Sequence, residues 1–324
     1  MRNRVLMRNC VWLLALLLYA LTFVNAQATR DASHLVPTGK GWGEALPTRL
    51  GPPRGLNPPR GPATNGIFYH GGPILPGSVN LYFIWYGDFV SGRAASDSLA
   101  TVDLLTEFFS AGGLGGSSYA RIDSTYADRT RTVSGKFALA ESTNDYYSRG
   151  LRLSDASVAA VVANAIATRA LPKDTNGVYF VLSSSDVSET SGFCSQYCGW
   201  HSHSTMSGSD IKYAFVGNPD RCPNACEEQV ISPNGNSGAD GMASTMAHET
   251  NEAVSDPDLN AWYDTAGNED GDKCAWKWGP VTGTLGDGAY NMTIAGHKWL
   301  IQMNWENSRG GGCDQKLSGK FYGQ

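Results

Sequence analysis

The segment His248-Glu249-Thr250-Asn251-Glu252 constrains the fold more than any other part of this chain. Residues four apart share one face of a helix, so His248 and Glu252 can point at the same ion. Glu249 lies one step round the helix, where it can hold a water against that ion and take its proton. Apolar residues on more than one side of the predicted helix, residues 239–254, indicate that it is largely buried. Buried His and Glu need partners, and a metal ion is a natural one.

The motif differs by one residue from the His-Glu-x-x-His zinc-protease helix, because Glu252 replaces the second His. We expect zinc, with calcium or manganese as alternatives because the extra carboxylate makes the site harder. The third ligand is expected from the acidic loop that follows, at Glu269 or Asp272, in preference to Asp258. A solvated helix face and a calcium-binding or solvent-facing loop are the non-catalytic interpretations of the same residues.

The region around the motif, about 25 residues, resembles the zinc helix of thermolysin-type metallopeptidases. The resemblance implies that Tyr263 stabilises the transition state and that Asp272 is the third ligand. Glu252 departs from that family, which has His at this position. The helical Asn-Glu motif that surrounds the family's third ligand is also missing.

Residues 1–26 have the pattern of a secretory signal peptide, with Arg2, Arg4 and Arg8 before a short apolar run and Ala26 before the cut. The apolar run is too short for a convincing membrane anchor. Cleavage would leave 22 basic and 30 acidic residues, a net charge of −8. We therefore expect an exported protein without a stable membrane anchor, and this charge disfavours nucleic acid as a partner.

Cysteine counting supports export. Cys10 leaves with the signal peptide, and six cysteines remain: Cys194, Cys198, Cys222, Cys226, Cys274 and Cys313. An even number in an exported chain predicts three disulfides, although the two C-x-x-x-C pairs are also compatible with a zinc cluster. If disulfides form, Cys274 is expected to pair with Cys313. Asn291 begins an Asn-x-Thr acceptor for glycosylation.

The chain divides into three parts by composition. After residues 1–26, residues 27–65 are rich in Pro and Gly and are expected to form an extended linker or a pro-segment. Residues 66–324 are expected to form one globular domain. Its predicted strands are 79–86, 178–182, 213–216 and 298–303, and its predicted helices are 98–110, 154–170 and 239–254. This alternation predicts an α/β or α+β domain with a mixed sheet, stabilised by disulfides.

His201 and His203 form a weaker candidate site. They are two residues apart and lie close to cysteines. Either could polarise a substrate carbonyl, but isolated histidines are more often polar surface residues, and we expect that here.

The domain also resembles the EXORDIUM / phosphate-induced protein 1 family of exported proteins, across most of residues 67–274. The resemblance rests on Tyr-His-Gly-Gly-Pro-Ile-Leu (69–75), Asn-Leu-Tyr-Phe-Ile-Trp-Tyr-Gly (80–87), Gly-Phe-Cys-Ser-Gln-Tyr-Cys-Gly (192–199), Phe-Val-Gly-Asn (215–218), Cys-Pro-Asn-Ala-Cys (222–226) and Gly-Ala-Asp-Gly-Met (238–242). It implies export and a shared fold, with plant members acting in the apoplast.

Two functions follow as hypotheses. The first is a secreted zinc-dependent metallohydrolase, a peptidase acting on extracellular proteins or peptides, in which His248 and Glu252 hold the metal and Glu249 activates water. The second is a non-catalytic extracellular protein that acts at a cell wall or on a host partner. An assembled cluster with an open coordination position would favour the first, and a closed cage or splayed acids the second.

Overall fold

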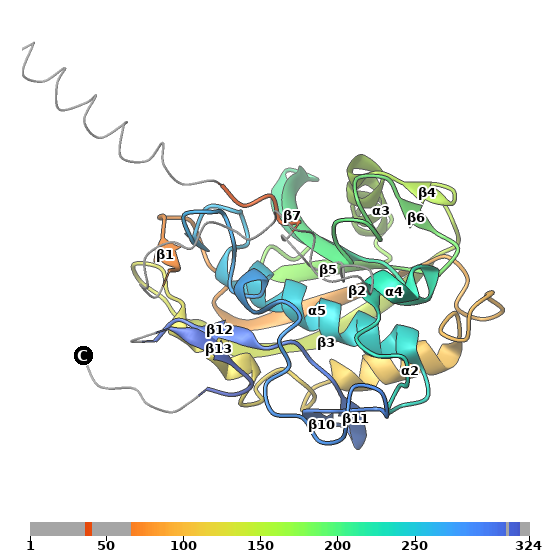
Figure 1. Cartoon of the computed structure of the whole chain (residues 1–324). Helices are drawn as coiled ribbons and strands as arrows, with labels where there is room; N and C mark the ends of the chain where they lie inside the picture. The colour runs from red at the N-terminus through yellow and green to blue at the C-terminus, as the bar shows by residue number, and fades with distance from the viewer. Residues whose placement is uncertain (1–35, 41–65, 309–310, 318–324) are drawn as a thin grey trace, which may run out of the picture.

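A five-stranded mixed sheet forms the centre of the fold (Figure 1). Its strands, in spatial order, are β3 (Val133–Asp145), β2 (Gly77–Tyr86), β5 (Gly177–Ser183), β8 (Ser209–Val216) and β7 (Gly199–Met206). The first four are parallel, and β7 pairs antiparallel with β8 at one edge. This computed structural model describes residues 36–40, 66–308 and 311–317, so the predicted signal peptide and most of residues 27–65 lie outside the described residues.

Helices cover both faces of the sheet (Figure 1). Alternate side chains of β2 divide between two hydrophobic clusters, as the two-residue period of a strand requires. Phe83 and its neighbours pack with α2 (Leu99–Phe108) and α5 (Ser237–Ser255), whereas Ile84 and its neighbours pack with α3 (Asp155–Ala167). The predicted mixed α/β single domain is therefore confirmed.

Short elements complete the fold. The small sheets pair β1 (Phe68–Tyr69) with β9 (Trp262–Tyr263), β4 (Arg152–Leu153) with β6 (Ser188–Glu189), β10 (Met292–Ile294) with β11 (His297–Trp299), and β12 (Asn304–Glu306) with β13 (Gly312–Asp314). The short helices are η1 (Ala120–Thr125), η2 (Pro219–Arg221), α4 (Pro223–Cys226) and η3 (Asp272–Cys274). The β1–β9 pair joins the start of the domain to the segment that follows α5.

The predicted late strand, residues 298–303, is wrong beyond Trp299. The backbone N–H groups that follow bond to scattered acceptors instead of a neighbouring strand. Ile301 donates to Asn291 Oδ1, Gln302 to Ser244 Oγ and Met303 to the Lys277 carbonyl. Two of these three N–H groups bond to side chains, which periodicity cannot reveal.

Helix α5 packs very closely on β7. A Cβ atom added at Gly199 would lie 2.6 Å from Thr245 Cγ2 and 3.2 Å from Glu249 Oε1. Only glycine fits this approach, because real Cβ atoms do not come so near to other heavy atoms. Gly199 therefore lets the helix place Glu249 against the start of β7.

Residues 36–40 pack on the same strand, two residues along from Gly199. The Gly39 carbonyl accepts a hydrogen bond of 3.0 Å from the His201 backbone N–H. Lys40 Nζ lies 2.6 Å from Asp155 Oδ2 and 5.3 Å from the centroid of the Trp200 ring. Part of the predicted linker or pro-segment thus contacts the domain, and it does so at His201.

The three predicted disulfides are confirmed. Cys274 pairs with Cys313 as expected, and the two C-x-x-x-C segments are joined to each other by Cys194–Cys222 and Cys198–Cys226. The cysteines are therefore cross-linked and do not form a zinc cluster. Among the residues that the structure describes, no helix has the length and apolar character needed to cross a bilayer.

The two parallel disulfides allow a matched stability test. Each closes a loop with a sequence separation of 28, so the entropic contribution, about 3.5 kcal/mol, should be equal. Cys198 and Cys226 are buried, whereas the other pair is half-buried. We expect the Cys198→Ala/Cys226→Ala variant to lose more unfolding free energy in urea than Cys194→Ala/Cys222→Ala, because it also leaves a cavity. Equal losses would show that burial adds nothing.

Candidate metal centre

Side-chain hydrogen bonds fix both ends of helix α5. Asn236 caps the N-terminus by accepting from the Ala239 N–H at 3.0 Å. At the other end Asp256 Oδ1 accepts from the backbone N–H groups of Asn260 and Ala261, both at 2.6 Å. These bonds turn the chain sharply after the helix and direct the acidic loop back toward it. The helix is buried throughout residues 238–255, as predicted.

His248, Glu252 and Asp272 form a first group of ligand atoms. His248 Nε2 lies 2.9 Å from Glu252 Oε1 and 3.8 Å from Asp272 Oδ1. The Asp272 backbone N–H also donates to Glu252 Oε1 at 2.9 Å, which fixes the loop against the helix. Ligand atoms around a tetrahedral zinc ion lie about 3.3–3.5 Å apart, and the observed distances bracket that spacing. These three residues can therefore hold one metal ion.

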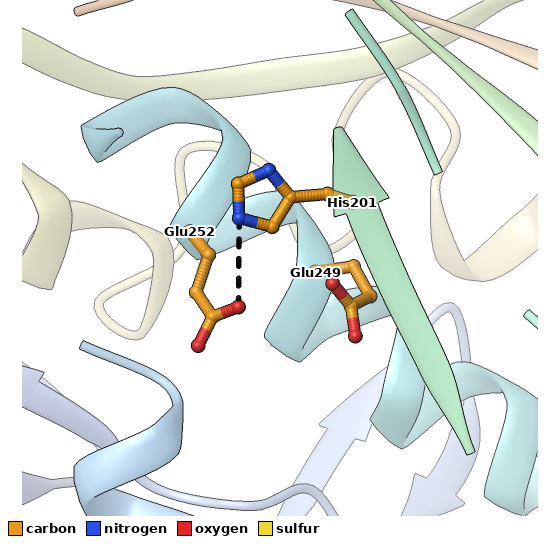
Figure 2. A group of neighbouring side chains, drawn as sticks. All are labelled: His201, Glu249 and Glu252. Atoms are coloured by element: carbon orange, nitrogen blue, oxygen red, sulfur yellow. Dashed lines mark ion pairs between the residues drawn. The ribbon is translucent and has the colours of Figure 1, made fainter. Parts of the chain in front are cut away.

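His201, Glu249 and Glu252 form a second group. Figure 2 shows their side chains converging, with both glutamates on α5 and His201 on β7. His201 Nε2 lies 3.7 Å from Glu252 Oε2 and 3.2 Å from each oxygen of Glu269. One ligand atom from each of the three residues in this group lies within 4.8 Å of the others. Glu252 belongs to both groups.

The expectation that His201 is a polar surface residue is wrong, since it is 1% exposed. His203 does lie near the surface, where its Nδ1 is 3.0 Å from Asp210 Oδ1. The sequence does contain a signal for a strand here. Ser207-Gly208 makes a tight turn back into the predicted strand at 213–216, and alternation in a strand would put residues 201 and 203 on one face. The polar composition of β7 concealed this strand.

The structure brings both predicted third ligands to the site, but beside different histidines. Asp272 lies near His248, and Glu269 lies near His201. Asp258, the less favoured alternative, lies apart from these contacts, with its Oδ1 2.5 Å from Lys212 Nζ. The choice between Glu269 and Asp272 as ligands to one ion stays a prediction.

Tyr263 stacks face to face on His70, with ring centroids 3.6 Å apart and an interplanar angle of 5°. It is buried on β9, after the turn that Asp256 fixes. Its role in stabilising a transition state therefore stays a prediction.

The electrostatics of the site reflect buried negative charge. Burial lowers the pKa of His201 to about 4, so its imidazole is neutral at neutral pH. Burial and the negative charges of Glu252, Asp256, Asp272 and Asp270 raise the pKa of Glu269 well above its ordinary value. Burial, followed by the charge of Glu252, raises the pKa of Asp270 to about 7. A bound cation would relieve this accumulation, because it stabilises the ionised carboxylates.

Gly271 is the residue that lets the acidic loop reach the ligands. A Cβ atom there would lie 2.8 Å from His248 Nε2 and 2.9 Å from Glu252 Oε1. The backbone of Gly271 has an ordinary helical conformation, so space rather than dihedral freedom requires glycine.

Asn291 uses its side chain inside the fold. Its Nδ2 donates to the carbonyls of Trp278 and Ile301, both at 2.8 Å. A glycan on Nδ2 would cost these hydrogen bonds, which disfavours glycosylation of the folded protein. The glycosylation site stays a prediction.

The matches to known proteins cover most of residues 66–324. The family model for the phosphate-induced protein 1 conserved region matches residues 67–314. The chain is similar to Protein EXORDIUM-like 5 of Arabidopsis thaliana, at 32% identity over 73% of this chain and 74% of that protein. It is also similar to Protein EXORDIUM-like 3 of the same plant (30% identity; 74% and 80%) and to Protein PHOSPHATE-INDUCED 1 of Nicotiana tabacum (26%; 62% and 68%). No solved structure matches the chain.

We expect Gly271→Ala to weaken zinc binding by pushing His248 and Glu252 apart, at a cost of about 1–3 kcal/mol for overpacking a close contact. Zinc titration of the ion-free protein, followed by calorimetry, measures the loss. Gly286→Ala is the matched control, because a Cβ atom there meets nothing within 4 Å. Equal zinc affinity in the two variants would contradict the assignment of these ligands.

Proposed function

This chain belongs to the phosphate-induced protein 1 family, and we propose that it is an exported metal-dependent hydrolase acting on extracellular proteins or peptides. The observation that carries the proposal is the group formed by His248, Glu252 and Asp272, with Glu249 on the same helix. Metal-assisted hydrolysis typically requires three such ligands and a carboxylate that acts as a base beside them.

Each residue has a chemical task in this proposal. A bound zinc ion, with calcium or manganese as the alternative, would supply Lewis acidity. His248, Glu252 and Asp272 would hold it, and Glu249 would position a water and accept its proton. The low dielectric around these residues strengthens their interaction with developing charge. Tyr263 remains our choice for stabilising the oxyanion.

Export is supported by independent features. Three disulfides are typical of proteins that fold in an oxidising compartment. The sequence begins with a basic, then apolar, pattern that a signal peptide requires. We accordingly place the protein outside the cell, where cell-wall or host proteins are the substrates to test first.

Burial favours a second candidate function. His248, Glu249 and Glu252 are each 1% exposed, as expected of a structural ion enclosed by protein. In that case the ion stabilises a non-catalytic extracellular protein, and binding partners rather than substrates define the function.

Metal content of the purified mature protein tests the site. Inductively coupled plasma mass spectrometry should find at least one zinc or manganese ion per chain, and Glu252→Ala should lose it, because Glu252 contacts both histidines. His203→Ala changes another histidine of β7, the strand that carries His201, and this variant should retain the metal. Calcium alone, or no bound metal, would contradict the zinc hydrolase.

Glu249→Gln separates catalysis from structure. We expect this variant to keep the ion held by His248 and to lose about 10²–10⁴ in kcat on a peptide library, because a general base contributes that factor. Thermal unfolding of the wild type with and without chelator should be measured beside it. Unchanged turnover in Glu249→Gln, or stabilisation by metal with no hydrolysis in any protein, would favour the structural alternative.

A further inference from the structure

The two oxygens of Glu252 face different histidines. Oε1 lies 2.9 Å from His248 Nε2, and Oε2 lies 3.7 Å from His201 Nε2. The side chain lies between α5, β7 and the acidic loop and is 1% exposed. A carboxylate placed in this way has the geometry of a bridge between two cations, with one oxygen for each.

We propose that the site holds two divalent metal ions bridged by Glu252. One ion is held by His248, Glu252 Oε1 and Asp272, and the other by His201, Glu252 Oε2 and Glu249. The inference rests on the proposed function for the first ion and extends it to a two-metal centre. Paired ions about 3.5–4 Å apart are a recurring arrangement in hydrolases, where they stabilise both the attacking and the leaving oxygen.

Charge balance supports two ions over one. Five carboxyl groups lie in or beside the two groups, and every one is at most 3% exposed: Glu249, Glu252, Glu269, Asp270 and Asp272. Buried carboxylates are costly unless paired with cations. If all five are ionised, one divalent ion balances two of these charges, whereas two ions balance four.

Nearby lysines have other partners. Lys212 Nζ contacts Asp210 and lies 2.5 Å from Asp258 Oδ1. The two acids beside His203 are therefore already paired with a lysine. Lys273 Nζ lies 3.1 Å from Asp264 Oδ2 and 4.7 Å from the centroid of the Trp305 ring. Neither lysine is paired with Glu252, and a metal ion can supply counter-charge there beside the two histidines.

Glu249 can act both as a ligand to the second ion and as the base that accepts a proton from water. Its carboxylate has two oxygens, and a ligand to the second ion that uses one oxygen keeps the other for a proton. Glu269, 3.2 Å from His201 Nε2, adds a further carboxylate on the same side. The second ion therefore requires no ligand from outside the described residues.

Metal stoichiometry tests the inference without any activity assay. The full mature chain is freed of metal, loaded with Mn²⁺, and measured by mass spectrometry and electron paramagnetic resonance. We expect two ions per chain with the spectrum of magnetically coupled Mn²⁺, because a bridging carboxylate couples them. His201→Ala should drop to one ion with an uncoupled spectrum, and His203→Ala should keep two.

The outcomes separate the two proposals. One uncoupled ion in the wild type, lost in His248→Ala and retained in His201→Ala, would overturn the two-metal centre and leave the proposed function standing. No bound ion would overturn both. The stoichiometry of the wild type decides the question even if a variant fails to fold, and circular dichroism identifies such a variant.

Discussion

The structure depends on a helix that is buried along its length and yet carries acids. Moving an ionised carboxylate out of water costs several kcal/mol, so Glu249 and Glu252 require partners on every side. The surrounding elements supply them at close range. Strand β7 approaches through Gly199, and the acidic loop approaches through Gly271. Both contacts exclude any larger residue, so the fold and the ligand cluster are set by the same packing.

The sequence predicted this helix and the centre of the fold well, for physical reasons. Periodicity identifies α3, and the His-Glu-x-x-Glu spacing identifies α5. Ser154 caps α3 by accepting from the Ser157 N–H. Buried parallel strands are continuous apolar runs, which makes β5 and most of β2 easy to recognise. The spacing of His248 and Glu252 likewise fixes their common direction, since a helix leaves no alternative.

The turn at Ser207-Gly208 indicates the strand that carries His201, but the burial of His201 comes from tertiary contact. His201 lies 47 residues before His248 on a polar strand, and no local pattern reveals that β7 packs against α5. The same limit applies to the choice between Glu269 and Asp272. Loop geometry puts each beside a different histidine, which spacing alone cannot distinguish. The disulfide pairing of the two C-x-x-x-C segments was undetermined for the same reason.

The contact between Gly39 and β7 also bears on the exposure of the sheet edge. The outer edge of an edge strand offers free backbone groups to any extended chain, a common start of aggregation. Strand β7 is such an edge, and the His201 N–H is already bonded to the Gly39 carbonyl. Lys40 anchors that cover through its contacts with Asp155 and Trp200. Residues 39 and 40 thus occupy part of the sheet edge nearest the buried acids, and that part is not open to pairing with another extended chain.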